Sequence, residues 1–280
     1  MLFGAEENHL AGVQHKVGAE GAVLNPPGLT DSHPHPSRQP HAMNPYTSPF
    51  VVNMVADSPE SARAEFIRKT YGHLAGAIAL FAILEYLFLS LGFGETALVL
   101  LGTSRFSWLI VLGAFMLVSW VAENWATYGT SMAKQYAGLA LYTVAEAVIF
   151  LPMIALSVAM TGDLSLLTQA GLITAAMVLG ISAVALTTRK DFSFLGGILK
   201  IGGFVALGLI VVSFILPISL GLWFSAAMIV FASGAILYNT SNLIRRYQPG
   251  QHVAAALSLF ASVALLFWYV LRILMSLRRN

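Results

Sequence analysis

Long apolar stretches separated by short polar breaks run through the chain from Tyr71 onward. Each stretch is close to the ~20 residues that an α-helix needs to cross the hydrocarbon core of a bilayer. Of all residues 57% are apolar and only 10% are charged, and the charged ones collect in the breaks. Soluble domains carry roughly a quarter charged residues. The pattern therefore predicts an all-α polytopic membrane protein whose surroundings are the lipid bilayer.

Seven stretches qualify as membrane spans, and the second is the shortest of them. They are Tyr71–Leu91, Phe106–Val121, Tyr136–Met160, Leu164–Leu186, Phe194–Leu216, Leu220–Ile244 and Val253–Leu274. Seven spans place Arg278 and Arg279 on the side that otherwise has few basic residues, so a re-entrant last segment is the alternative. We favour seven complete spans.

The first 60 residues differ from the rest because they are rich in Pro, Gly, His and Ser. Such a segment cannot bury enough apolar surface to fold. We therefore expect a disordered tail over residues 1–60 and a transmembrane domain over residues 61–280. The tail histidines His33, His35 and His41 lie among prolines without a scaffold, so we assign them no metal site.

The distribution of Lys and Arg predicts which side of the membrane each loop occupies. One side receives Arg63, Arg68, Lys69, Lys134, Arg189, Lys190, Arg245 and Arg246. The opposite loops contain only Arg105. Cytoplasmic loops carry the excess of Lys and Arg in membrane proteins. We expect a cytoplasmic N-terminus and insertion in the cell inner membrane.

Several function classes find no support in the composition. The formal charge is only +2 and the basic residues form no stripe, which argues against nucleic acid as a partner. The chain has no cysteine, so it has no thiolate metal site and no thiol nucleophile. We find no zinc-ligand pair, no nucleophile elbow and no phosphate-binding glycine loop, and the glycines of FLGGILKIGG suit close helix packing better. We therefore expect no enzyme activity and no cofactor.

Four ionisable residues stand inside the expected spans: Glu85, Glu146, Lys200 and Arg272. Such a side chain costs at least about 2.5–3.5 kcal/mol at the bilayer midplane. Glu146 lies about eleven residues into its span, close to the midplane, and is too short to reach the surface. It is either neutral and hydrogen-bonded, or it faces a cation or a watered cavity. Its expected partner is Lys200 or a polar cluster around Tyr142 and Asn239.

The other three ionisable residues have an interfacial interpretation as well as a functional one. Glu85 lies nearer the outer surface and could reach it. The long stem of Lys200 could carry its ammonium group to the cytoplasmic interface. Arg272 would also be interfacial, unless its helix lies at the centre of the bundle.

The stretch ILYNTSNLIRRY, residues 236–247, carries four consecutive polar side chains where the sixth span ends. Asn often hydrogen-bonds its own backbone near a helix end. Alternatively, Asn239 lines a polar vestibule at the same depth as Lys200. The glycosylation pattern at Asn239 is dismissed because the loop charges place it on the cytoplasmic side.

Five stretches together resemble the Bax inhibitor-1 (YccA-like, transmembrane Bax inhibitor motif) family. They are FIRKTYGHLAGAI in the first span, the Glu146 stretch with Pro152, RKDFSFLGGILKIGG in the fifth span, ILYNTSNLI in the sixth and ALSLFASVALLFWYVLRIL in the seventh. The resemblance covers roughly Ala62 to Leu274. It implies a seven-helix bundle whose last helix is surrounded by the others. It also implies a pH-regulated calcium leak, or a regulator of stress and proteolysis in the membrane.

The departures from the family pattern bear on the mechanism. The resemblance implies two aspartates, one in the sixth span and one in the seventh, that share protons and gate the leak. Asn239 and Ser262 occupy these positions, and neither group titrates near neutral pH. Some members have a second-span glutamate facing the pore, whereas no acid lies between Ser107 and Val121. Arg272 matches the family's basic residue late in the last helix.

Two functions from different classes follow from this reading. The first is an ion leak, for calcium or protons, through a polar vestibule with the di-aspartate switch missing. Its site residues would be Asn239, Ser262, Glu146, Lys200, Arg272 and Glu85. The second is a membrane-embedded regulator that binds a membrane protease or another membrane protein and transports nothing.

The orientation can be tested with reporter fusions after Glu60, Gly162 and Pro249. We expect a cytoplasm-dependent reporter to be active at the first and third positions and a periplasm-dependent reporter at the second, because the loop charges alternate in that way. Periplasmic activity at the first or third fusion would overturn the orientation, as would cytoplasmic activity at the second.

Overall fold

The structure is a computed structural model that describes residues 54–279 except 103, 105, 130, 189, 217 and 218. The described residues form a bundle of α-helices with one short 3-10 helix. The elements are η1 (Val55–Asp57), α1 (Glu60–Ser90), α2 (Phe93–Gly102), α3 (Ser107–Tyr128), α4 (Met132–Thr161), α5 (Ser165–Thr188), α6 (Leu195–Ile215), α7 (Gly221–Ser241), α8 (Leu243–Arg246) and α9 (His252–Arg279).

Seven of these helices, α1, α3, α4, α5, α6, α7 and α9, are long and apolar enough to cross a membrane. This confirms the all-α membrane fold that the hydropathy pattern predicts. The last span is a continuous helix of 28 residues, about 42 Å long, so its length suffices for a complete crossing. The chain is a multi-pass integral membrane protein.

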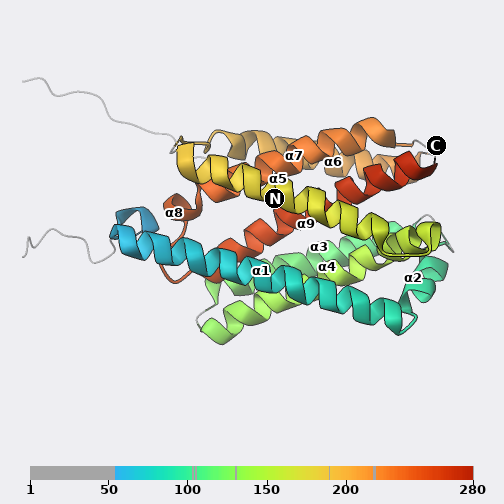
Figure 1. Cartoon of the computed structure of the whole chain (residues 1–280), viewed down its shortest axis with the longest axis horizontal. Coiled ribbons are helices and arrows are strands. Elements are labelled where there is room, and N and C mark those ends of the chain that lie inside the picture. The colour runs from blue at the N-terminus through green and yellow to red at the C-terminus, as the bar shows by residue number, and fades with distance from the viewer. Residues whose placement is uncertain are drawn as a thin grey trace, which may run out of the picture. The chain divides into compact units, whose positions relative to one another are not determined.

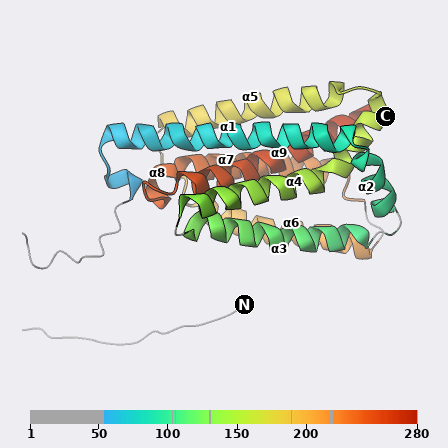
Figure 2. The same ribbon diagram turned by 90° about the horizontal axis from the view of Figure 1, so that it is seen from below.

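Helix α9 lies at the centre of the bundle and contacts α1, α3, α4, α5 and α7. It runs between α1 and α4 on one side and α5 and α7 on the other (Figures 1 and 2). In its most apolar stretch 72% of the residues are buried, against 6% in α6. The expectation of a surrounded last helix is confirmed, and α6 is a peripheral helix with mostly lipid-facing side chains.

Small residues let the helices of the bundle approach closely. Ala254, Ala255 and Ala256 at the start of α9 are all at most 3% exposed. Gly138 of α4 packs against α3, where a Cβ atom on the glycine would lie 2.6 Å from the Ala122 carbonyl oxygen. Helix association in lipid depends on such close packing because lipid tails are as apolar as the side chains they would replace.

Local side-chain chemistry fixes several helix ends. The Ser131 side chain accepts a hydrogen bond from the Lys134 N–H at 3.3 Å and so caps α4. Helix α4 ends at Thr161 and is followed by Gly162, whose φ of 74° is left-handed backbone that favours glycine. Asp163 then accepts a hydrogen bond from the Ser165 N–H at 2.8 Å, and its hydrogen bonds to Ser165 lower the pKa of the Asp163 carboxyl.

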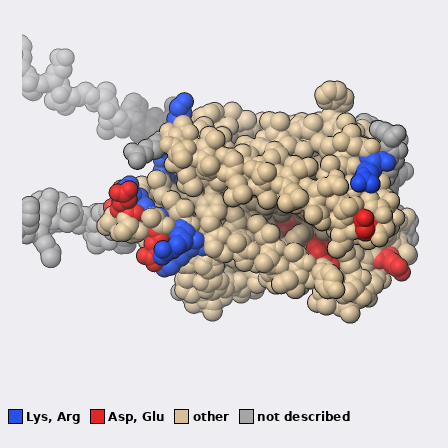
Figure 3. All heavy atoms as spheres, in the orientation of Figure 1, with Lys and Arg blue, Asp and Glu red and all other residues tan. Residues whose placement is uncertain are grey.

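We call the two ends of the bundle the basic end, where α1, α4, α6 and α9 begin, and the opposite end, where they finish. Figure 3 shows blue basic atoms gathered mainly at the end where α1 begins, while the long flank is almost uncharged. Arg105 and Arg189 from the loop count lie outside the described residues. The charge asymmetry that underlies the expected orientation is therefore present among the other basic residues.

Several boundaries differ from the predicted spans, including the end of α9 at Arg279 rather than Leu274. Helix α1 begins at Glu60 rather than Tyr71, because its first turns project beyond the apolar stretch and hydropathy finds only the lipid-embedded part. Helix α3 continues past Val121 to Tyr128, and α7 ends at Ser241 with α8 as a separate turn. Helix α2 was not predicted; its ten residues are too few for a span, and it packs on α4 at the opposite end.

The structure describes only the last residues of the predicted tail, from Met54 onward. Val55–Asp57 forms η1, and the buried Val55 donates its N–H to the Tyr247 carbonyl oxygen at 3.0 Å. The residues before Met54, with His33, His35 and His41, lie outside the described part of the chain. Their disorder and their lack of a metal site stay predictions.

The contact between α3 and α4 can be tested by changing Gly138→Ala. The new Cβ would lie 2.6 Å from the Ala122 oxygen and 2.7 Å from the Ala126 nitrogen, so the helices have to separate. We expect a loss of about 1–3 kcal/mol in the free energy of unfolding, seen as a lower thermal midpoint in detergent. The matched control is Gly113→Ala in α3, whose Cβ would meet nothing within 4 Å. Equal midpoints for the two variants would contradict the close packing.

Candidate functional site

Asn239 of α7 and Ser262 of α9 lie in direct contact inside the bundle, toward the basic end. The Asn239 amide donates one hydrogen bond to the Ser262 hydroxyl at 2.8 Å and another to the Ser258 carbonyl oxygen at 3.1 Å. Ser262 is 6% exposed and Asn239 is half-buried. The Asn239 amide therefore bonds the central helix and not its own backbone. The two residues aligned with the family's aspartates form one neutral hydrogen-bonded pair.

Tyr247 extends this pair across the basic end. Its hydroxyl donates to the Ser258 hydroxyl at 3.0 Å, and the Ser262 hydroxyl donates to the Ser258 carbonyl at 3.0 Å. Burial raises the pKa of the Tyr247 hydroxyl, so it stays a neutral donor at physiological pH. We call Asn239, Tyr247, Ser258 and Ser262 the closure cluster, because together they join α7, α9 and the segment after α8.

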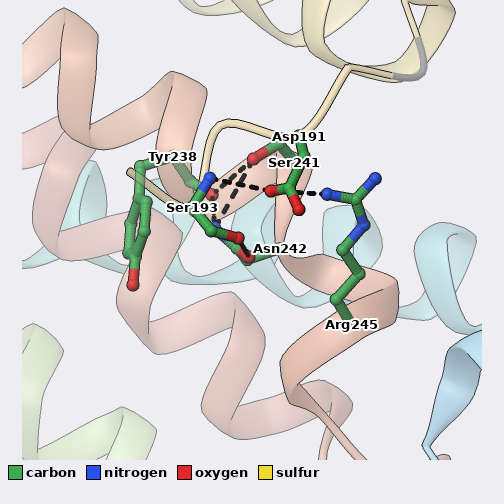
Figure 4. Close-up of polar contacts among 6 residues, drawn as sticks. All are labelled: Asp191, Ser193, Tyr238, Ser241, Asn242 and Arg245. Atoms are coloured by element: carbon green, nitrogen blue, oxygen red, sulfur yellow. Dashed lines mark hydrogen bonds and ion pairs between the residues drawn. The ribbon is translucent and has the colours of Figure 1, made fainter. Parts of the chain in front are cut away.

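The remaining polar residues of ILYNTSNLIRRY fix the point where α7 ends. The Asn242 amide donates to the Tyr238 carbonyl oxygen at 2.8 Å, which is the local backbone contact expected of an Asn near a helix end. Its amide oxygen accepts from the Ser193 hydroxyl at 3.2 Å, and the Ser241 hydroxyl also donates to Tyr238 (Figure 4). Thr240 is buried with its hydroxyl 3.4 Å from that of Tyr71 on α1.

An exposed ion pair joins the same junction to the loop between α5 and α6. The Arg245 guanidinium lies 2.6 Å from the Asp191 carboxylate (Figure 4). The Ser193 hydroxyl and N–H lower the pKa of the Asp191 carboxyl, and the charge of Arg245 lowers it further. Because the pair is exposed, solvent screens it, and its role is to orient the loop more than to stabilise the bundle.

Glu146 of α4 is 5% exposed, and its carboxyl group lies beside the Tyr142 hydroxyl one turn earlier on the same helix. Tyr142 is also buried and packs edge-on against Phe115 and Phe260. Tyr142 was one of the partners expected for Glu146. No direct contact between Glu146 and Lys200 or Asn239 is found among the described residues.

Glu85 of α1 does not reach the surface, contrary to its interfacial interpretation. The residue is 5% exposed, and neither carboxylate oxygen has a hydrogen-bond partner in the described part of the protein. The helix turns this side chain inward because its neighbours on the lipid side, such as Ile83 and Tyr86, are the exposed ones. A buried carboxyl group without a protein partner favours a water molecule or a cation beside it.

Lys200 and Arg272 occupy positions near the ends of their helices. Lys200 is exposed five residues into α6, which agrees with an ammonium group that reaches the interface. Arg272 is half-buried on the central helix, beside Tyr269 and near the opposite end. The structure therefore brings Asn239 and Ser262 together and places Glu146, Glu85, Lys200 and Arg272 at four other points.

The oxygen donors of the candidate site residues stand at separate points of the bundle. Carboxylate, amide and hydroxyl oxygens are hard ligands. Within the described ranges, however, no group of three or more His, Asp or Glu residues could hold a metal ion together. The chain thus offers separate oxygen donors along the bundle.

Comparison with known proteins identifies the family. The family model described as inhibitor of apoptosis-promoting Bax1 matches residues 63–279, nearly the whole helical bundle. The chain belongs to the Bax inhibitor-1 family. An uncharacterised protein of Pseudomonas aeruginosa is 33% identical over 211 residues, which are 74% of this chain and 87% of the relative.

Two other relatives carry functional names. The modulator of FtsH protease YccA of Escherichia coli K12 is 44% identical over 94 residues, 33% of this chain and 42% of YccA. The Golgi anti-apoptotic protein of Vaccinia virus (strain Lister) is 25% identical over 225 residues, 79% of this chain and 89% of the viral protein. No solved structure is significantly similar to the chain.

Three residues of the site in this Bax inhibitor-1 family protein were not predicted from the sequence. Tyr247 and Ser258 lie within the stretches ILYNTSNLIRRY and ALSLFASVALLFWYVLRIL, but they carry no charge, so only the fold reveals their contact. Glu123 lies beyond the expected end of the second span, yet α3 includes it and it interacts electrostatically with Tyr142 and Tyr247. No acid lies between Ser107 and Val121, but α3 continues to Tyr128 and therefore includes Glu123. Hydropathy marks only the apolar residues up to Val121, while the helix itself continues to Tyr128.

The contact between Glu146 and Tyr142 predicts a difference between two substitutions. Glu146→Gln keeps a hydrogen-bonding group beside the buried Tyr142 hydroxyl, whereas Glu146→Leu removes it. We expect the Leu variant to be about 1–3 kcal/mol less stable than the Gln variant, as measured by thermal unfolding in detergent.

The control for this pair is the Tyr142→Phe background, in which Gln and Leu at position 146 should differ by much less, because the hydroxyl that needs a partner is gone. A difference that persists in the Phe background would mean that the hydrogen bond to Tyr142 is not its cause.

Proposed function

We propose that the chain is a slow cation leak protein of the cell inner membrane, for calcium or protons, with its N-terminus in the cytoplasm. The observation that carries the proposal is the 2.8 Å hydrogen bond between the neutral side chains of Asn239 and Ser262. These two positions are the ones at which the family resemblance implies a pair of proton-sharing aspartates that gates the leak. The closure cluster then acts as a gate whose state does not depend on pH.

The buried acids support a cation path. Glu85 and Glu146 place carboxyl groups inside the bundle, whereas Glu123 of α3 is exposed toward the basic end. Acidic groups within membrane spans attract cations and carry protons in pumps and transporters. The neutral closure cluster offers a divalent cation little attraction, since calcium prefers charged oxygen ligands. The leak is therefore expected to be slow.

A second function is modulation of a membrane protease without transport. The match to the modulator of FtsH protease YccA favours it, because the identity is 44% over the 94 aligned residues. In this function the exposed surfaces at the basic end would contact the protease. The leak would work by permeation and the modulator by contact, and neither function needs covalent chemistry.

Calcium flux from liposomes that contain the purified chain tests the leak. We expect the wild-type leak to change little between roughly pH 6 and 8, because no coupled acid pair titrates at the closure cluster. The double variant Asn239→Asp with Ser262→Asp should leak more as pH rises in that range. Two adjacent carboxylates hold one proton at lower pH, and loss of that proton leaves like charges that push α7 and α9 apart. Either single variant should lack this steep change.

The matched control is Asn239→Ala with Ser262→Ala, which removes the hydrogen bond without adding a titratable group. It should leak faster than wild type at every pH. A wild-type leak that already switches sharply with pH would show that the closure cluster is not the gate. No flux in any variant, together with altered degradation of a membrane substrate by an FtsH-type protease when the chain is present, would favour the second function.

A further inference from the structure

A groove of about 550 Å³ runs between α1 and α4 near the basic end. Gly72, Gly76 and Leu80 line it from α1, and Tyr136 and Ala140 line it from α4. The two helices cross rather than run parallel, so they separate toward this end (Figure 1). Ala77 of α1 and Thr143 of α4, which are both buried, also line the groove.

The groove stays open because two glycines form its wall. A Cβ atom on Gly72 or on Gly76 would meet nothing within 4 Å. Gly138 lies against a neighbouring helix, whereas within the described bundle no helix packs closely on Gly72 or Gly76. The missing side chains of these two glycines therefore leave open space. The space is of the size of ligand pockets, about 300–1,000 Å³.

Two cations stand at one end of the groove. Arg68 and Lys69 line it, and both are exposed. The Lys69 ammonium lies 2.8 Å from the Glu65 carboxylate in an exposed ion pair, while Arg68 is paired with no acid within the described chain. The groove thus joins a basic mouth to an apolar channel.

The depth of the mouth matches the headgroup region of a bilayer. From Lys69 to the end of α1 at Ser90 the helix rises about 31 Å, which is the thickness of the hydrocarbon core. Arg68 and Lys69 therefore lie where phosphate groups lie, and Gly76 and Leu80 lie deeper, where acyl chains begin.

His73 gives the mouth a fixed wall. Its Nδ1 lies 2.7 Å from the Lys69 carbonyl oxygen and its Nε2 lies 3.0 Å from the Tyr136 hydroxyl. The imidazole also stacks on the Tyr136 ring, with centroids 5.3 Å apart. The wall between α1 and α4 is thus formed before any ligand binds.

We propose that this groove binds an anionic phospholipid, with the phosphate on Arg68 and Lys69 and one acyl chain along Gly72, Gly76 and Leu80. Basic pockets between membrane helices are known to take anionic headgroups. A second copy of the chain fits less well. A symmetric contact through α1 would bring Arg68 and Lys69 of both copies together at the same depth, and like charges repel.

Native mass spectrometry of the full chain tests the proposal with phosphatidylglycerol and phosphatidylcholine of identical acyl chains. Wild type should retain phosphatidylglycerol in preference to phosphatidylcholine. The double variant Arg68→Gln with Lys69→Gln should lose this preference by about fivefold per cation. The variant Gly76→Leu should lower retention of both lipids, because the new side chain fills the channel, and Gly72→Leu should act in the same way.

Matched controls lie elsewhere on the bundle. Lys190→Gln removes a cation at the basic end outside the groove, and Gly208→Leu adds a side chain on α6 where a Cβ would also meet nothing within 4 Å. Both should bind lipid as wild type does. A thermal midpoint for every variant checks that the bundle is folded.

Three outcomes would overturn the proposal. Unchanged lipid retention in the double charge variant would remove the phosphate site. Unchanged retention in both folded glycine variants would show that no acyl chain enters the groove. A shift from dimer to monomer on Gly76→Leu, without a change in bound lipid, would assign the groove to a second copy of the chain.

Discussion

The burial of α9 is the constraint on which the rest of the structure depends. Lipid tails are as apolar as the helices, so the helices associate through close packing and hydrogen bonds and not through the hydrophobic effect. Helix α9 supplies both, because small residues fill its start and aromatic side chains fill its middle. Phe260 and Phe267 pack against Phe81 of α1, and Trp268 packs against Phe150 of α4. Each helix that contacts α9 is positioned by this one surface.

The polar side chains of α9 gather in its first part, where they contact neighbouring helices at the basic end. Ser258 and Ser262 accept hydrogen bonds from the Asn239 amide of α7. The Gln251 amide, just before α9, donates to the Thr127 carbonyl oxygen of α3 at 3.3 Å. The His252 ring lies 4.9 Å from that of His73 on α1. Three neighbouring helices, α1, α3 and α7, thus contact the start of the central helix through polar side chains. Beyond Ser262 the helix is apolar until Arg272.

The fold could be predicted because hydropathy reports which residues meet lipid, and seven helices follow from it directly. The contact of Asn239 with Ser262 could also be anticipated, but only through the family resemblance. The orientation of Glu85 could not. Helix α1 is apolar on every side, so its sequence carries no stripe that tells the buried face from the lipid face. Its first turns were missed for the opposite reason, since polar residues continue a helix beyond the membrane without any hydropathy signal.

The proposed groove and the closure cluster meet at the start of α9. His73 forms a wall of the groove and also lies against His252, the first residue of α9. A ligand that fixes the spacing of α1 and α4 would therefore act on the helix that carries Ser258 and Ser262. Since neither Asn239 nor Ser262 titrates near neutral pH, a proton cannot be the signal at that contact. On the two proposals together, the occupancy of the α1–α4 groove takes the place that protonation would hold in a relative with two aspartates.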